Sequence, residues 1–176
     1  METRDRIKRS FQRNSRALQL QPSIGRGTAV TRVSLEDGLR CVVEEGDWRL
    51  VVDMPSSSGG ADAGPNPGVL GRGALGSCLA MSYAKWGAAL DVPIDEVTVE
   101  VQADYDAAGE YGVADVPAGY SQVRYIVTIA SDAPEEEILR VLDIADERAC
   151  YHDVLRRPVE LRREVHIRAP RPQLKR

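Results

Sequence analysis

The chain has 176 residues with a formal net charge of −4, and 43% of them are hydrophobic while only 5% are aromatic. This length fits one domain, whose core must be built mainly from valine, leucine, isoleucine and alanine. The acidic balance argues against nucleic acid as the main partner, and no apolar run approaches the length of a membrane span, so we expect neither nucleic acid nor a membrane as a partner.

The chain opens with charged residues and not with the apolar stretch of a secretory signal. We therefore expect a cytoplasmic protein, in which thiols stay reduced. The three cysteines are then expected to be core or redox residues and not a disulfide framework. With two histidines and no close Cys/His spacing, neither a zinc site nor another cofactor is expected.

Residues 3–20 are strongly basic, and their spacing predicts a short helix that docks on the body of the protein or on a partner. Three apolar side chains fall roughly on one face, namely Ile7, Phe11 and Leu18. A nucleic-acid arm is the less favoured alternative to a solvated basic face. Because Pro22 and Gly25 end the segment, we treat residues 1–25 as a basic helical extension.

Three short strands are expected next, separated by glycine-containing turns, as an antiparallel meander. They cover residues 27–35, 38–45 and 48–54. Residues 56–67 are rich in serine, glycine and proline, and this composition predicts a flexible loop. From Pro67 to about Leu90 the sequence lacks strand alternation and is rich in alanine, leucine and other small residues, which predicts a buried helix.

The stretch G-R-G-A-L-G over residues 71–76 has the outline of a dinucleotide-binding loop. That motif needs a buried strand running directly into the glycines, whereas a glycine- and proline-rich segment precedes them here. We therefore place the glycines inside the helix, where each costs about 1 kcal/mol relative to alanine. The missing side chains are expected to let another backbone or helix approach closely.

Cys78 lies on this predicted helix and shares a face with Gly71 and Ala74. Such a face leaves open space beside the sulfur atom, which suits a reactive thiol. The residues alone equally describe a small buried hydrophobe in a tight helix contact, which is the common fate of a free cysteine.

Residues 96–105 alternate between apolar and polar side chains and predict a strand with one wet face. A loop over 106–119 and a second strand over 120–130 follow. Residues 131–137 predict a helix start, because Ser131 or Asp132 can cap it and three glutamates lie near its positive end.

A last strand is expected from Pro158, because its apolar residues share one face. They are Val159, Leu161, Val165 and Ile167. The expected order is (helix)-βββ-α-ββ-α-β, and consecutive strands should pair. The sequence therefore predicts an α+β fold with mainly antiparallel sheets, and not a doubly wound parallel sheet.

Residues 51–80, V-V-D-M-P-S-S-S-G-G-A-D-A-G-P-N-P-G-V-L-G-R-G-A-L-G-S-C-L-A, resemble the OsmC/Ohr family of osmotically induced and organic-hydroperoxide-resistance proteins. In that family a strand ends in an Asp-x-Pro-like element, a Gly-Gly loop and Asn-Pro follow, and a helix then carries a cysteine. Residues 136–156 resemble the second family helix, whose cysteine lies near its C-terminal end. The resemblance covers an OsmC-like domain over about residues 26–168 and leaves a basic tail over 169–176.

The resemblance implies an intertwined homodimer with sheets around two central helices. It also implies a cysteine-based peroxidase that reduces organic hydroperoxides in oxidative-stress defence. A first cysteine attacks the peroxide as a thiolate, and a second condenses with the resulting sulfenic acid to a disulfide that an external dithiol reduces. By position, Cys78 takes the first role and Cys150 the second.

The resemblance further implies an activating arginine from the turn between the first strands. Cys78 lies too far into its helix for the N-terminal dipole to help, and an unperturbed thiol is mostly protonated at neutral pH. Arg40 is the nearest equivalent of the family arginine, with Arg26 and Arg32 as competitors. His152 is either a base beside the second cysteine or an ordinary surface histidine.

Two departures from the family pattern leave an alternative open. Gly68 stands where the hydroperoxidase branch has a glutamate that orients the arginine, and Ala149 can be aligned with the second cysteine, so that Cys150 takes the place of the proline that follows it. The alternative is a non-catalytic or differently employed dimeric binding protein of the same fold. Gly68 favours this alternative, whereas the presence of two cysteines favours the enzyme. Cys41 is interpreted as a core residue.

Overall fold

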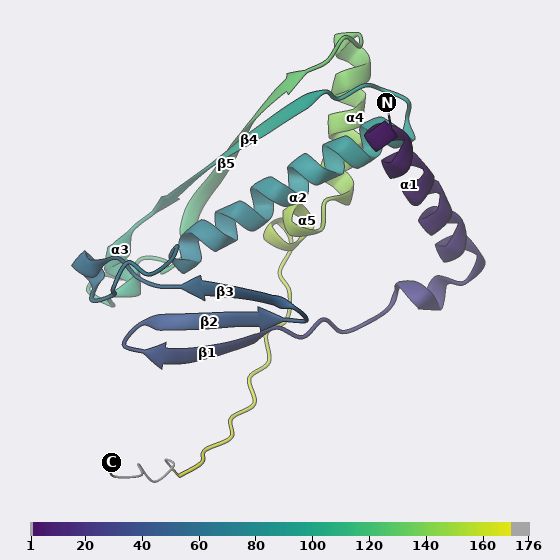
Figure 1. Ribbon diagram of the computed structural model, residues 1–176. Helices are drawn as coiled ribbons and strands as arrows, with labels where there is room; N and C mark the ends of the chain where they lie inside the picture. The colour runs from purple at the N-terminus through teal and green to yellow at the C-terminus, as the bar shows by residue number, and fades with distance from the viewer. Residues whose placement is uncertain (1, 170–176) are drawn as a thin grey trace.

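Figure 1 shows the computed structural model of the protein, which describes residues 2–169. Two antiparallel sheets and one long helix dominate it, and this arrangement confirms the expected α+β fold class. The elements in chain order are α1 (Glu2–Leu20), the 3-10 turn η1 (Pro22–Gly25), β1 (Arg32–Asp37), β2 (Arg40–Glu45), β3 (Trp48–Val52), the 3-10 turn η2 (Ser56–Ser58), α2 (Pro67–Ala89), β4 (Glu96–Tyr105), α3 (Ala107–Glu110), β5 (Tyr120–Ala130), α4 (Glu135–Arg148) and α5 (Cys150–Arg156).

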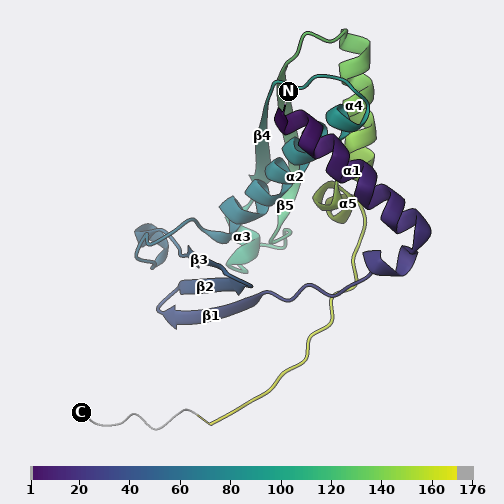
Figure 2. The same ribbon diagram turned by 45° about the vertical axis from the view of Figure 1, so that its right-hand side comes forward.

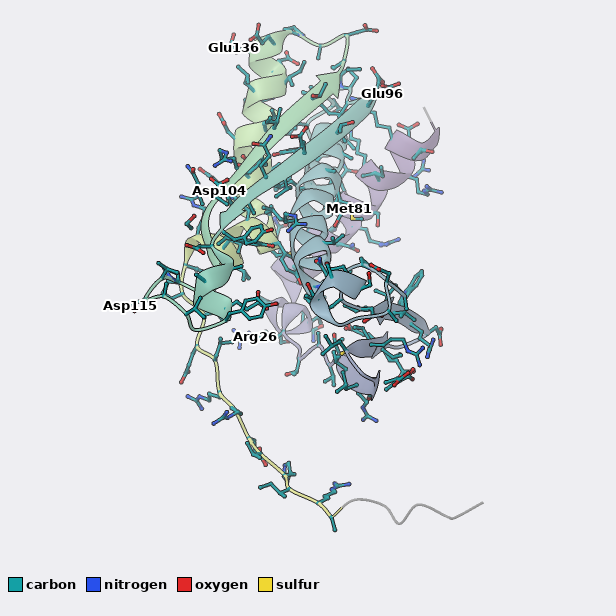
Figure 3. All side chains as sticks on the ribbon, turned by 90° about the vertical axis from the view of Figure 1, so that its left-hand side faces the viewer. Arg26, Met81, Glu96, Asp104, Asp115 and Glu136 are labelled. Atoms are coloured by element: carbon teal, nitrogen blue, oxygen red, sulfur yellow. The ribbon has the colours of Figure 1, made fainter. Side chains whose placement is uncertain are left out.

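The two sheets form where alternating sequence predicts strands. Strands β1, β2 and β3 pair in that order, and β4 pairs with β5. The turns of the first sheet hold Gly38 and Gly46 at φ of 56° and 55°, in the left-handed region that glycine adopts at little cost. Figure 3 shows β4 extending from Glu96 past Asp104, and its alternate valines pack toward the core.

The core lies where α2 packs against β4 and α4. Its buried cluster consists of Leu75, Leu79, Tyr83, Ala145 and Ala149. Valines from the inward faces of β4 and β5 cover this cluster from the sheet side. The long helix α2 is therefore apolar on several sides, as expected for a helix between a sheet and other helices.

The basic helix α1 docks on the body of the protein. Phe11 meets Trp86 of α2 edge to face, with ring centroids 4.8 Å apart, and the Lys8 Nζ atom lies 2.6 Å from a carboxylate oxygen of Asp91. Figure 2 shows α1 lying across the end of α2. Of the two docking partners expected for this helix, the structure shows the body of the protein itself.

The loop between β3 and α2 is held by one buried carboxylate, which corrects the expectation of a flexible segment. Asp53 is 2% exposed, and its side chain accepts hydrogen bonds from the backbone N–H groups of Met54, Ala61 and Ala63 at 2.8, 3.0 and 3.1 Å. The Asn66 side chain then accepts from the third residue beyond it and caps α2. These bonds fix the position at which α2 begins.

Two expectations for the C-terminal half are wrong in the described chain. The helix expected over 136–156 breaks at Ala149, whose ψ of 117° is extended, so that α4 and α5 are separate helices. The strand expected from Pro158 is not formed: residues 157–169 are extended, unpaired and exposed, and Figure 1 shows them leading away from the body. A strand needs an edge to pair with, and within residues 2–169 this segment meets none.

The start of α4 also differs in detail from the expectation. The helix begins after Pro134, and neither expected residue caps it. Ser131 instead accepts a hydrogen bond from the Ala133 backbone N–H at 3.1 Å, which shapes the turn before the helix. The three glutamates occupy the first turn, as expected, where the helix dipole favours negative charge.

Candidate functional site

The structure brings two of the three cysteines together. The Cys78 Sγ and Cys150 Sγ atoms lie 3.5 Å apart, although 72 positions separate them in the sequence. Cys78 is half-buried on α2, and Cys150 is exposed as the first residue of α5. Since a disulfide bond is about 2.05 Å long, the two sulfur atoms need only a small movement to form one.

The break between α4 and α5 explains why Cys150, and not Ala149, meets Cys78. On a continuous helix a shift of one residue rotates the side chain by about 100°. The chain leaves the helix at Ala149 and re-enters it at Cys150, so this rotation does not apply. Ala149 is fully buried in the core, while the next side chain reaches the neighbouring sulfur atom.

The two thiols influence each other. The hydrogen bond with Cys78 raises the pKa of the Cys150 thiol above its ordinary value, and burial raises it further. Cys150 therefore stays protonated to higher pH than a free cysteine. Because the thiolate is the nucleophilic form of a cysteine, the contact with Cys78 makes the Cys150 thiol less nucleophilic than a cysteine of ordinary pKa.

The glycines of α2 divide into two environments. A Cβ atom added at Gly76 would lie 3.3 Å from the Val101 Cγ2 atom of β4, which is the close approach that the sequence predicts. A Cβ atom added at Gly71 or Gly73 would meet nothing within 4 Å. Within residues 2–169, the small face that Gly71 shares with Cys78 is consequently open.

Arg40 lies at the start of β2, in the first sheet. Its Nη2 atom is 3.7 Å from the Glu36 carboxylate, and its charge helps to lower the pKa of Asp53, after backbone hydrogen bonds led by that of Ala63. The buried Arg40 Nε atom has no hydrogen-bond partner within residues 2–169. No hydrogen bond or ion pair of these residues joins Arg40 to Cys78, and its activating role stays a prediction.

A half-buried polar network lies one helical turn before Cys150, and sequence reasoning missed it. The Asp146 carboxylate accepts hydrogen bonds from the Tyr83 hydroxyl at 2.7 Å and from the Tyr125 hydroxyl at 2.8 Å. Burial, followed by the contact with Asp146, raises the pKa of Tyr125 to about 12, and the same causes raise the pKa of Tyr83. The available signal was an acidic residue directly after Ala145, in the apolar stripe of the predicted helix.

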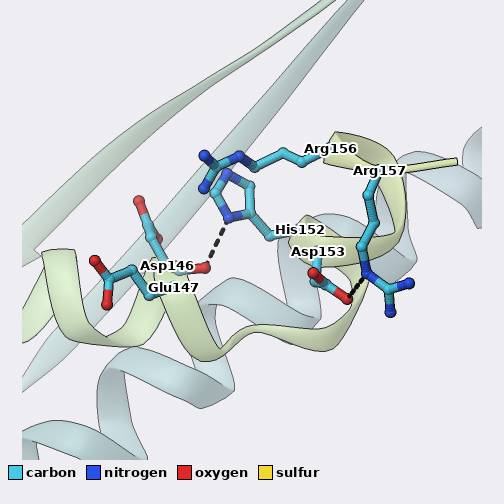
Figure 4. A pocket seen from close by; sticks show the side chains of 6 residues that line it. All are labelled: Asp146, Glu147, His152, Asp153, Arg156 and Arg157. Atoms are coloured by element: carbon cyan, nitrogen blue, oxygen red, sulfur yellow. Dashed lines mark hydrogen bonds and ion pairs between the residues drawn. The ribbon is translucent and has the colours of Figure 1, made fainter.

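His152 joins this network, so it is not a free surface histidine. Its half-buried ring places Nδ1 2.7 Å from the Asp146 backbone oxygen and Nε2 3.4 Å from the Tyr125 hydroxyl. The ring lines an open cavity of about 300 Å³ between α4 and α5, and Figure 4 shows the side chains around it. The lining residues are Asp146, Glu147, His152, Asp153, Arg156 and Arg157.

The described part of the chain contains no cluster of three or more His, Cys, Asp or Glu residues placed to hold a metal ion. Among residues 2–169, no helix has both the length and the apolar character needed to cross a membrane.

One family model matches more than half of the chain. The family model for OsmC-like protein matches residues 59–164. An uncharacterized protein of Haloferax volcanii is 23% identical over 122 residues, which cover 69% of this chain and 82% of that protein. No function comes from this relative.

Solved structures share the fold. The OsmC-like protein from Mycoplasma pneumoniae matches with a TM-score of 0.64 at 16% identity, covering 74% of this chain and 88% of that one. An organic hydroperoxide resistance protein OsmC from Legionella pneumophila matches with a TM-score of 0.56 at 17% identity, covering 74% and 90%. At such identities the likeness shows a common fold alone.

Proposed function

The chain belongs to the OsmC family, because the family model matches more than half of the chain. From this premise we propose that the protein is a thiol-dependent peroxidase that reduces organic hydroperoxides in oxidative-stress defence. The observation that supports the proposal best is the 3.5 Å separation of the Cys78 and Cys150 sulfur atoms. The name of the Legionella relative, an organic hydroperoxide resistance protein, supports the substrate class.

The proposed reaction begins at Cys78. Its thiolate attacks one peroxide oxygen, so that an S–O bond forms, the O–O bond breaks and the alcohol leaves after taking up a proton. The Cys150 sulfur then attacks the sulfenic acid, a disulfide forms and water leaves. An external dithiol reduces this disulfide by thiol–disulfide exchange and supplies the two electrons that the hydroperoxide consumed.

Cys78 is assigned the first step because it is half-buried beside an open small-residue face, where an apolar hydroperoxide can approach. Cys150 is assigned the second step because the family resemblance implies this role and because its Sγ atom lies 3.5 Å from that of Cys78. Arg40 is proposed as the activating cation, as the family resemblance implies. In this structure Arg40 pairs with Glu36 and does not contact Cys78. We propose that Arg40 reaches Cys78 only when two copies of the chain assemble.

We propose that the assembled form is a homodimer. The apolar side of the first sheet is exposed, with Leu35 and Trp48 at 66% and 79%. The unpaired C-terminal segment carries Leu161 and Ile167 at 94% and 93% exposure. Exposed apolar surface of this kind marks an interaction site, and a second copy that contacts the sheet and pairs the segment would give the intertwined dimer that the family implies.

The proposal is tested by peroxide consumption, with cumene hydroperoxide or hydrogen peroxide as substrate. Dihydrolipoamide, thioredoxin and glutathione are compared as reductants. We expect turnover of cumene hydroperoxide with a dithiol reductant and its loss in Cys78→Ser, because a serine hydroxyl supplies no thiolate at neutral pH. Cys150→Ser should react once and stop at a sulfenic acid that a dimedone-type probe traps.

Cys41→Ser is the matched control, since Cys41 is half-buried in β2 and should affect stability alone. The alternative function, a non-catalytic dimeric binding protein, is favoured by Gly68. The space for a side chain there is limited by Arg72 and Tyr120, whose polar atoms would lie 3.1 and 3.2 Å from an added Cβ. A Cys78 thiol that does not react with either peroxide would establish this alternative.

A further inference from the structure

The first turn of α5 carries Cys150 but has little of its own to hold it in place. The helix has seven residues, and no side chain caps its N-terminus at Ala149. A helix this short is marginal in water by itself, because nucleation costs more than a few hydrogen bonds return. The position of the Cys150 sulfur atom must therefore be fixed by contacts with the rest of the protein.

One such contact crosses the break between α4 and α5. The last four carbonyl groups of an α-helix lack partners within it, and the Asp146 carbonyl is one of these. The His152 Nδ1 atom lies 2.7 Å from this oxygen. A carbonyl oxygen only accepts hydrogen bonds, so Nδ1 carries the proton and donates it.

Asp146, which accepts that hydrogen bond, is held in place by two other elements. Tyr83, which is fully buried, donates to the Asp146 carboxylate from α2, and Tyr125 donates to it from β5. The helix α2 also carries Cys78. The contacts thus run in a closed circuit from Cys78 along α2 to Tyr83, through Asp146 to His152, and along α5 back to Cys150.

We propose that His152 is a positioning residue that clamps the first turn of α5 onto α4 and so holds the Cys150 thiol beside Cys78. The use of the cysteine pair in peroxide reduction rests on the proposed function, but the clamp acts on disulfide formation by any oxidant. Without the hydrogen bond from His152 to the Asp146 carbonyl, which we call the clamp, α5 samples more orientations. The effective concentration of the Cys150 thiol beside Cys78 then falls.

The experiment measures the equilibrium of the reduced protein with glutathione disulfide. One protein disulfide forms while one glutathione disulfide is reduced to two glutathione thiols, so electrons and protons balance. The disulfide fraction is read by alkylation and mass spectrometry. His152→Ala should lower the equilibrium constant about tenfold, which is the upper range for one hydrogen bond. His152→Asn should restore most of it, because its amide N–H can take the place of Nδ1–H.

Leu155→Ala is the matched control, since Leu155 is 57% exposed on the same short helix. An unchanged constant in His152→Ala, or an equal fall in Leu155→Ala, would overturn the proposal. Circular dichroism establishes that each variant is folded. If His152→Ala does not fold, nitrogen NMR of the parent decides: a proton on Nδ1 of neutral His152 supports the clamp, and a proton on Nε2 alone overturns it.

The two proposals fail separately. A parent protein that forms the disulfide in a His152-dependent way but consumes no hydroperoxide would contradict the proposed function and keep the clamp. A parent that consumes cumene hydroperoxide while His152→Ala keeps the same glutathione equilibrium would contradict the clamp and keep the function.

Discussion

The half-buried Asp146 carboxylate accepts hydrogen bonds from two tyrosine hydroxyls, and the stability of this arrangement depends on both tyrosines being neutral. Burial raises the pKa of Tyr125 to about 12, from an ordinary value of 10.0. Above pH 10 the unfolded chain loses this proton first, so the equilibrium shifts toward unfolding. The stability that Tyr125 contributes is present below pH 10 and is lost as the pH rises from 10 through 12.

Tyr125→Phe should therefore flatten the decline in stability between pH 10 and 12. At pH 8 the variant should be less stable by about 1 kcal/mol, because the Asp146 carboxylate loses one of its two hydroxyl donors. Urea unfolding at pH 8 and at several pH values between 10 and 12 measures the free energy of unfolding of the parent and the variant. Tyr105→Phe is the control, since Tyr105 is 70% exposed on β4. Equal alkaline slopes in the parent and Tyr125→Phe would contradict the assignment.

At the scale of elements, the loop before α2 depends on the ionised form of Asp53. Three backbone N–H groups, with that of Ala63 contributing most, hold the pKa of this carboxyl below its ordinary value of 3.8. The stability that it contributes is present above about pH 4 and is lost as the pH falls through the lowered pKa. This carboxylate fixes where α2 begins, and it therefore also fixes the position of Cys78 on that helix.

Asp53→Asn should lower the melting temperature at pH 7, because an amide presents one acceptor oxygen where the carboxylate uses two. It should also weaken the acid dependence of stability between pH 5 and 3. Asp115→Asn, in the exposed loop that Figure 3 labels, is the control and should leave both quantities unchanged. An Asp53→Asn variant that melts like the parent would show that the loop does not depend on the carboxylate.

The two kinds of glycine in α2 lead to opposite expectations. Gly76→Leu should destabilise the protein by about 1–3 kcal/mol, because the new side chain overpacks the contact with Val101 and β4. Gly71→Ala meets open space in the protomer and should stabilise α2 by up to about 1 kcal/mol, since alanine is the better helix former. Denaturant unfolding of the reduced protein distinguishes them, and a tolerated Gly76→Leu would show that β4 yields there.

The elements that the sequence predicts well are those fixed by local patterns. Alternation places the strand at 96–105, the strand expected over 120–130 also forms, and the helix expected from Pro67 begins there in the structure. The features that the sequence does not predict depend on contacts between residues several positions apart along the chain. Asp53 orders a loop whose composition indicates flexibility, and the break at Ala149 is stabilised across two helices by His152. Neither partner is visible in a sequence window.

At the scale of the whole molecule, the strand pattern after Pro158 and the apolar side of the first sheet have no packing partner within residues 2–169. One face of this sheet carries Val33, Leu35 and Leu50. Paired residues on neighbouring strands lie on the same side of a sheet, and the register connects Val33 through Val43 to Leu50, while Leu35 is two residues beyond Val33 on the same strand. Their exposed fractions are 58%, 66% and 51%. Burial of apolar surface contributes about 25 cal/mol per Å², so covering this face would supply a substantial part of an association energy.

The homodimer prediction is therefore specific about the surface that it buries. Sedimentation equilibrium of the reduced parent at micromolar concentration should give twice the protomer mass of 19.3 kDa. Leu35→Glu should shift the protein toward monomer, because a charge on the apolar face loses its hydration when that face is covered. Ser34→Glu adds the same charge to the opposite face of β1 and should remain dimeric. A monomeric parent would contradict the dimer itself, whereas a dimer that tolerates Leu35→Glu would place the interface elsewhere, with the open glycine face of α2 as the next surface to substitute.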